Sequence, residues 1–191
     1  MSIDTPGFAN PVDDAQTAFR SVLDAMARPG SSHSAGTGLT PPPCLDPATA
    51  AMLLTLADAE TPVFLAPELE PARDWVAFHC GAALLAEPAR AAFVVATSLP
   101  DLTALDSGTD EAPENSATVI LQLPALGEGP AWALAGPGLR EPGILRARGL
   151  PADFAAAWAR NHAAFPRGID LILCAGAVLV ALPRSLRITE S

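Results

Sequence analysis

The sequence predicts an α/β protein in which a mixed central sheet is flanked by helices. Segments with apolar residues three or four positions apart, the spacing of an amphipathic helix, alternate with short apolar runs typical of buried strands. Near the end of the chain, two apolar runs around Ala175-Gly176 predict an antiparallel hairpin at the edge of the sheet. With 191 residues, half of them apolar and 17% charged, the chain has the composition of one folded domain, 1–191, with flexible ends at 1–12 and 187–191.

The first helix is expected from Asp13 to Ala27, and Pro29-Gly30 ends it. Its apolar residues lie three or four positions apart and predict one buried face: Ala15, Phe19, Val22, Leu23 and Met26. Asp46-Pro47 is typical of a helix start, with the acid as cap and proline at the first helical position. The helix that follows, up to Ala57, is apolar on nearly all sides, which predicts that it is buried.

Further along the chain, strands and helices are expected to alternate for most of the length. They are a strand at 62–65, a helix at 71–80, a strand at 92–97, a short helix at 100–105, strands at 118–123 and 131–135, a helix at 153–162, and the hairpin of 170–174 with 178–182. This alternation indicates a largely parallel or mixed sheet with an antiparallel pair at its C-terminal edge.

Charge and hydropathy exclude two classes of partner. The formal net charge of -10 repels phosphate backbones, so nucleic acid is not expected to bind. Every apolar stretch is shorter than the roughly 20 residues of a membrane helix, and the first residues lack the basic and apolar regions of a secretory signal. A cytoplasmic location without a membrane contact is therefore expected.

The absence of lysine limits the chemistry of the chain. All eleven basic residues are arginines, so no side-chain amine can form a Schiff base, and pyridoxal-phosphate chemistry in its usual form is excluded. The glycine-rich phosphate loop, the dinucleotide fingerprint and the hydrolase nucleophile motif are also missing. No cofactor is therefore expected.

The cysteines and histidines do not indicate a metal site. Three cysteines at wide spacing, Cys44, Cys80 and Cys174, favour buried or half-buried thiols over disulfides or zinc ligands. The three histidines lie far apart in the sequence without a close set of ligating residues. No metal is expected.

Four charged or titratable residues are the candidates for ligand binding: Arg20, His79, Asp170 and Arg184. Arg20 follows an apolar helical residue and Asp170 starts an apolar strand, so both are expected to be partly buried and paired. His79 lies one helical turn after Trp75 near a helix end, where a structural role is favoured over a catalytic one. Arg184 belongs to the arginine-rich segment 140–187, and guanidinium groups bind phosphate in two-pronged fashion. No catalytic residue is identified.

A series of short motifs, spread from about residue 13 to residue 187, resembles the PhnH family of phosphonate metabolism. The motifs are Ala18-Phe19-Arg20, Ala25-Met26, Pro29-Gly30, Leu53-Leu54-Thr55-Leu56-Ala57-Asp58, Thr61-Pro62-Val63, Phe78-His79, Gly108-Thr109, Pro113-Glu114, Ala117-Thr118-Val119-Ile120-Leu121-Gln122, Gly136-Pro137-Gly138, Phe165-Pro166-Arg167-Gly168-Ile169-Asp170-Leu171-Ile172-Leu173 and Leu182-Pro183-Arg184. Each motif is weak alone, and the order and spacing of the set carry the resemblance.

The resemblance implies a fold similar to the large domain of pyridoxal-phosphate-dependent transferases without the cofactor. It also implies a role as an accessory subunit of the carbon–phosphorus lyase core complex with PhnG, PhnI and PhnJ, and a homodimer when the chain is isolated. In the family, the assembly couples an alkylphosphonate to the ribose of ATP, and PhnJ, an iron–sulfur radical enzyme, then cleaves the carbon–phosphorus bond. The chain lacks a cysteine set for such a cluster, so it is not expected to perform that step.

Two further hypotheses remain open. The chain is alternatively a homodimer that binds a ribose phosphate or a phosphonate in a pocket at the C-terminal edge of the sheet, through Arg20, His79 and Arg184. A third possibility is a free-standing transferase, which activity of the purified chain would reveal.

Overall fold

The computed structural model describes residues 5–191, which form a mixed α/β structure around a seven-stranded sheet. The expected class, a mixed sheet flanked by helices, is confirmed. The α-helices of the described chain are α1 (Pro11–Ala27), α2 (Pro47–Leu56), α3 (Arg73–Cys80) and α4 (Phe154–Ala163). Short 3-10 helices connect them: η1 (Pro67–Ala72), η2 (Pro88–Arg90), η3 (Leu102–Ala104) and η4 (Pro113–Asn115).

The seven-stranded sheet has the strand order β1-β9-β8-β5-β4-β2-β3. Its strands are β1 (His33–Ser34), β2 (Val63–Leu65), β3 (Leu84–Leu85), β4 (Phe93–Ala96), β5 (Thr118–Gln122), β8 (Asp170–Ala175) and β9 (Val178–Leu182). Strands β3, β2, β4, β5 and β8 run parallel, and β9 turns back against β8 as the expected antiparallel hairpin. The hairpin was expected at the edge of the sheet, but the short strand β1 pairs with β9 and forms that edge. The sheet is therefore parallel at its centre and antiparallel at one side.

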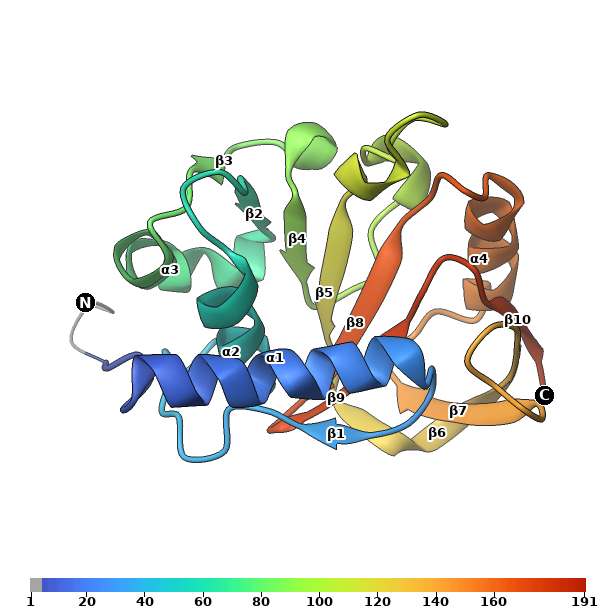
Figure 1. Cartoon of the computed structure of the whole chain (residues 1–191), viewed down its shortest axis with the longest axis horizontal. Helices are drawn as coiled ribbons and strands as arrows, with labels where there is room; N and C mark the ends of the chain where they lie inside the picture. The colour runs from blue at the N-terminus through green and yellow to red at the C-terminus, as the bar shows by residue number, and fades with distance from the viewer. Residues whose placement is uncertain (1–4) are drawn as a thin grey trace.

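Alternating side chains of the central strands supply two separate cores. Ile120 of β5 and Ile172 of β8 belong to the core under α1, α2 and α3. Their neighbours Val119 and Leu171 point to the opposite face and belong to the core under α4. The near-continuous apolar runs follow from this arrangement, because a strand covered on both faces has no polar side. Figure 1 shows α3 and α4 at opposite sides of the view, with the strands between them.

A second, three-stranded antiparallel sheet covers part of the α4 face. Its order is β10-β6-β7, from β6 (Ala125–Ala135), β7 (Gly143–Arg148) and β10 (Arg187–Glu190). Strand β6 begins earlier than the expected start at residue 131, and its register with β7 shifts between Leu126 and Ala131. Strand β10 pairs with β6 along residues 187–190, where a flexible end was expected.

Helix α1 begins two residues before the expected Asp13 and ends at Ala27 as expected, but it buries a different face. Its buried residues are Ala18, Val22 and Ala25. Phe19 and Leu23, which we expected in the core, are 48% and 56% exposed. The apolar arc of this helix is wider than the surface that the sheet and α2 can cover, so one side of it remains at the molecular surface (Figure 1).

No helix within residues 5–191 combines the length and the apolar character that crossing a bilayer requires.

Candidate functional site

The carboxyl ends of β5 and β8, where open α/β sheets commonly bind ligands, are closed by the segment before α2. The amide of Gln122, the last residue of β5, accepts a hydrogen bond from Asp46 N at 2.7 Å and donates one to Cys44 O at 3.1 Å. The Asp46 carboxylate accepts from Gly176 N at 2.9 Å, just after β8. Asp46 is thus the residue before α2, as expected, but its carboxylate binds the β8–β9 turn instead of capping the helix.

At the opposite, amino end of β8, Asp170 and Arg184 form a largely buried ion pair. The side chains are 18% and 14% exposed. The guanidinium of Arg184 donates to Asp170 through Nε, at 3.1 and 3.2 Å, and through Nη2 at 2.5 Å. Arg184 N also donates to Asp170 Oδ1 at 2.7 Å, and Nη1 reaches Pro113 O at 2.7 Å. The expectation that Asp170 is partly buried and paired is confirmed.

The ion pair lies beside a second buried polar contact, made by Asn161 of α4. Its side-chain amide donates to Ile169 O at 2.8 Å and accepts from Ile169 N at 2.7 Å. Gly168 packs against the same asparagine with φ +130, and a Cβ at this position would lie 3.1 Å from Asn161 O and from its Oδ1. Parts of several motifs that are distant in the sequence therefore meet here, namely 113–114, 165–173 and 182–184.

His79 has the surroundings that its spacing predicts. Its ring lies on the ring of Trp75, with a centroid distance of 4.8 Å, in the last turn of α3. Its Nε2 is 3.2 Å from Thr5 O, which also accepts a hydrogen bond from Trp75 Nε1 at 2.9 Å. Two rings of one helix thus hold the N-terminal segment through a single carbonyl.

Arg20 does not have the burial that the sequence analysis expected. It is exposed on α1, and no hydrogen bond or ion pair joins it to another residue within 5–191. Of the four candidates, the structure brings together Asp170 and Arg184. Neither Arg20 nor His79 is linked to that pair by a hydrogen bond or an ion pair of the described chain.

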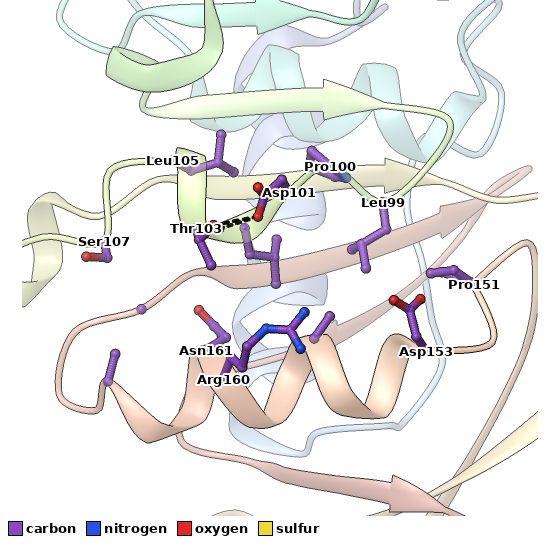
Figure 2. A pocket seen from close by; sticks show the side chains of 14 residues that line it. Leu99, Pro100, Asp101, Thr103, Leu105, Ser107, Pro151, Asp153, Arg160 and Asn161 are labelled. Atoms are coloured by element: carbon purple, nitrogen blue, oxygen red, sulfur yellow. Dashed lines mark hydrogen bonds between the residues drawn. The ribbon is translucent and has the colours of Figure 1, made fainter.

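A cleft of about 580 Å³ opens between α4 and the segment 99–107, which includes η3 (Figure 2). Its apolar lining includes Leu99, Leu102, Leu105 and Ala157. Its polar lining includes Asp101 on one wall and Asp153 and Arg160 on the other. The hydroxyl and the N–H of Thr103, together with the charge of Arg160, lower the pKa of Asp101.

Of the motifs in the sequence, 165–173 reaches this cleft through Gly168, but the charged residues of the cleft lie outside the motifs. Arg160 could be noticed only as one of the arginines between residues 140 and 187, and Asp101 only as part of an acidic segment. The two approach each other through the packing of α4 on the sheet.

The cysteines are free thiols with the predicted burial. Cys174 is fully buried and Cys44 and Cys80 are partly buried. Burial raises the pKa of Cys80 and of Cys174 to about 12, so neither is a thiolate at neutral pH. No cluster of three or more histidine, cysteine or acidic residues suited to a metal ion occurs in the part of the chain that the structure describes.

Comparison with known proteins gives a consistent family assignment. Residues 6–189 match the family model described as bacterial phosphonate metabolism protein (PhnH). The chain is 40% identical over 186 residues to the alpha-D-ribose 1-methylphosphonate 5-triphosphate synthase subunit PhnH of Rhizobium meliloti (strain 1021), covering 95% of this chain and 93% of the relative. It is 32% identical over 175 residues to the putative C-P lyase subunit protein HtxG of Stutzerimonas stutzeri, covering 91% and 85%. This chain therefore belongs to the PhnH family of bacterial phosphonate metabolism proteins.

Proposed function

We propose that this chain is an accessory subunit of the assembly that couples an alkylphosphonate to the ribose of ATP before the carbon–phosphorus bond is cleaved. The names of its relatives support this role, since one is a subunit of a ribose methylphosphonate triphosphate synthase and the other a putative C-P lyase subunit. Its partners in this proposal are PhnG, PhnI and PhnJ, and its location is the cytoplasm. In isolation the chain forms a homodimer. The core belongs to the type found in the large domain of pyridoxal-phosphate-dependent transferases, used here without the cofactor.

The exposed apolar side of α1 carries the subunit assignment. Val12, Phe19 and Leu23 are 77%, 48% and 56% exposed. They lie seven and four residues apart, so they form one stripe along the helix. Apolar side chains that line up along one helix are typical of a surface that another protein covers.

Charged residues beside this stripe suit a protein partner. Asp13, Arg20, Asp24 and Arg28 alternate in sign along the helix, and an exposed ion pair of 3.0 Å joins Arg28 to Asp24. An apolar centre beside a polar rim of both signs is the usual arrangement of a protein–protein interface. We assign the stripe to contact with the other subunits in the complex and with a second copy in the isolated chain.

A double substitution on the stripe tests this assignment. Phe19→Asp with Leu23→Asp removes both large apolar side chains without touching the buried face of α1. We expect the variant to remain folded, because exposed substitutions change stability by only about 0.5 kcal/mol each, and to lose co-purification with PhnG, PhnI and PhnJ. The measurement is affinity purification of the co-expressed set, with the melting temperature of the isolated variant as the folding check.

Phe78→Asp is the matched control, since Phe78 is an exposed aromatic residue, at 66%, on a different helix, α3. It is expected to leave co-purification unchanged. Undiminished recovery of the α1 variant with all three partners would contradict the assignment of this surface.

The second candidate function is a homodimer that binds a ribose phosphate or a phosphonate. The residues first considered for it, Arg20, His79 and Arg184, do not line the cleft beside α4. The observation that favours small-molecule binding is the cleft beside α4, which has the size of a ligand site. Calorimetry of the purified chain with ribose 5-phosphate and with methylphosphonate tests it, and an absence of heat at millimolar concentrations would exclude it without affecting the subunit role.

A further inference from the structure

The cleft between α4 and the segment 99–107 combines an apolar base with charged walls. Its volume of about 580 Å³ falls within the range of small-molecule sites, about 300 to 1,000 Å³. Leu102 and Leu105, both nearly buried, contribute to the base. Neither the ion pair of Asp170 and Arg184 nor the stripe on α1 uses this space.

Arg160 brings into the cleft a guanidinium whose hydrogen-bond donors are unused, although its charge acts on Asp101 across the cleft (Figure 2). Within residues 5–191 it makes no hydrogen bond and no ion pair, whereas Arg167 pairs with Asp110 at 3.1 Å and Arg184 binds Asp170. Its five N–H donors are therefore available for an oxyanion, which guanidinium can bind in two-pronged fashion.

Two carboxylates of the cleft also have unused acceptor capacity. Thr103 donates to Oδ1 of Asp101 through its N–H at 3.0 Å and its hydroxyl at 2.7 Å, and Oδ2 receives no hydrogen bond from the described chain. The carboxylate of Asp153, at the start of α4, is likewise without a donor among residues 5–191. Both can accept from an ammonium group, which carries three donors.

The balance of these charges indicates what kind of ligand fits. Two carboxylates face one guanidinium, and the whole chain carries a formal charge of -10. A simple anion is repelled by this field, and a simple cation leaves the hydrogen-bond donors of the guanidinium unused. A molecule with one charge of each sign satisfies both walls.

We propose that this cleft binds a short zwitterion, with its oxyanion on Arg160 and its ammonium group between Asp101 and Asp153. The alkyl chain that links the two ends rests on Leu102 and Leu105. The oxyanion is a phosphonate or a carboxylate, since both accept two parallel hydrogen bonds from guanidinium. This inference does not rest on the subunit role of the chain.

Calorimetric titration of the purified full chain tests the inference with matched ligands. The zwitterions 2-aminoethylphosphonate and β-alanine differ only in the oxyanion, whereas ethylphosphonate lacks the ammonium group and ethylamine lacks the oxyanion. We expect at least one zwitterion to bind about tenfold or more tightly than both single-charge ligands. Binding of neither zwitterion at about 50 mM would overturn the inference. So would binding of ethylphosphonate or ribose 5-phosphate as tight as that of the better zwitterion.

Two substitutions locate the site. Arg160→Gln removes the guanidinium charge with a somewhat shorter polar side chain, and Asp153→Asn removes the carboxylate charge without a change of size. Each is expected to weaken binding of the zwitterion about tenfold or more. Arg90→Gln is the control, because Arg90 is exposed on η2 and outside the cleft. If Arg160→Gln and Asp153→Asn bind the zwitterion as tightly as Arg90→Gln and the unsubstituted chain do, the assignment to this cleft is overturned. Co-purification with the partner subunits is measured separately, so failure here leaves the subunit role intact.

Discussion

Asn161 joins the end of α4 to the start of β8 through both ends of its amide. It is buried, and it donates to Ile169 O and accepts from Ile169 N. Asn161→Ala leaves a buried N–H and a buried C=O without a partner, so we expect a loss of about 2 to 4 kcal/mol in the free energy of unfolding. Urea unfolding measures it, with the exposed Asn115→Ala as control. A loss no larger than that of the control would show that the amide contacts do not stabilise this junction.

For the buried ion pair of Asp170 and Arg184, removing one partner is expected to cost more stability than replacing both partners by neutral residues. Arg184→Ala leaves the Asp170 carboxylate uncompensated at 18% exposure, so we expect a loss of about 3 kcal/mol. Replacing both residues together, Asp170→Asn with Arg184→Gln, is expected to cost less than Arg184→Ala alone. Both variants are compared by thermal and by urea unfolding. If they lose the same stability, the expected cost of leaving the Asp170 carboxylate without its partner is contradicted.

Thiol reactivity tests the burial of Cys80 and Cys174. Because burial raises the pKa of Cys80 and Cys174 to about 12, their thiolate fraction at pH 8 is on the order of 10⁻⁴. We expect neither to react with a thiol reagent in the native protein, and all three to react in denaturant. Rapid labelling of Cys174 in native protein, identified by mass spectrometry, would contradict its burial.

The burial of a charged residue could be predicted correctly for Asp170 but not for Arg20. Asp170 begins a run of apolar residues that fills a central strand, so few alternatives to burial exist. Arg20 follows Phe19 on a helix whose apolar arc is wider than the surface available to cover it. Which side of such an arc packs depends on tertiary contacts, and the sequence placed Phe19, and Arg20 with it, on the wrong side.

Helix α4 packs against the three-stranded sheet through its aromatic residues. Trp158 is fully buried and donates from Nε1 to Leu186 O at 2.8 Å, just before β10. Phe154 meets Trp132 of β6 edge to face, with a centroid distance of 5.5 Å. These contacts connect α4 to the three-stranded sheet.

Substitution of Trp158 tests this connection. Trp158→Ala removes a large buried side chain and is expected to cost about 3 to 5 kcal/mol. Trp158→Phe keeps most of the packing and loses the hydrogen bond, so we expect a smaller loss of about 1 to 2 kcal/mol. The measurement is chemical unfolding of both variants, and equal losses would indicate that packing contributes little.

Among residues 5–191, the strands not expected from the sequence are the two-residue strands β1 and β3 of the seven-stranded sheet, and β7 and β10 of the three-stranded sheet. Strand β7 carries exposed arginines at 146 and 148, and β6 contains Gly127, Gly129 and Pro130, which usually interrupt strands. One face of this sheet is open to solvent, so its pattern is weaker than that of β5 or β8. The buried central strands were predictable because both of their faces are apolar.

For the whole molecule, the order of elements was sufficient to predict the class and the closing hairpin. It was not sufficient to predict the cleft beside α4, because Asp101 and Arg160 approach only after the sheet brings their elements together. The exposed stripe on α1 also could not be predicted, because it depends on which side of the helix packs against the rest of the molecule. The properties that suit this chain to a complex are therefore tertiary, although its family membership is readable in the motifs.

The most direct test is affinity purification from cells that express this chain with PhnG, PhnI and PhnJ, with the tag on PhnI and the recovered assembly weighed by native mass spectrometry. The subunit role predicts that the chain is recovered in a fixed ratio to the other three. A complete assembly of the remaining subunits, purified with the chain present in the cell but missing from the particle, would contradict it.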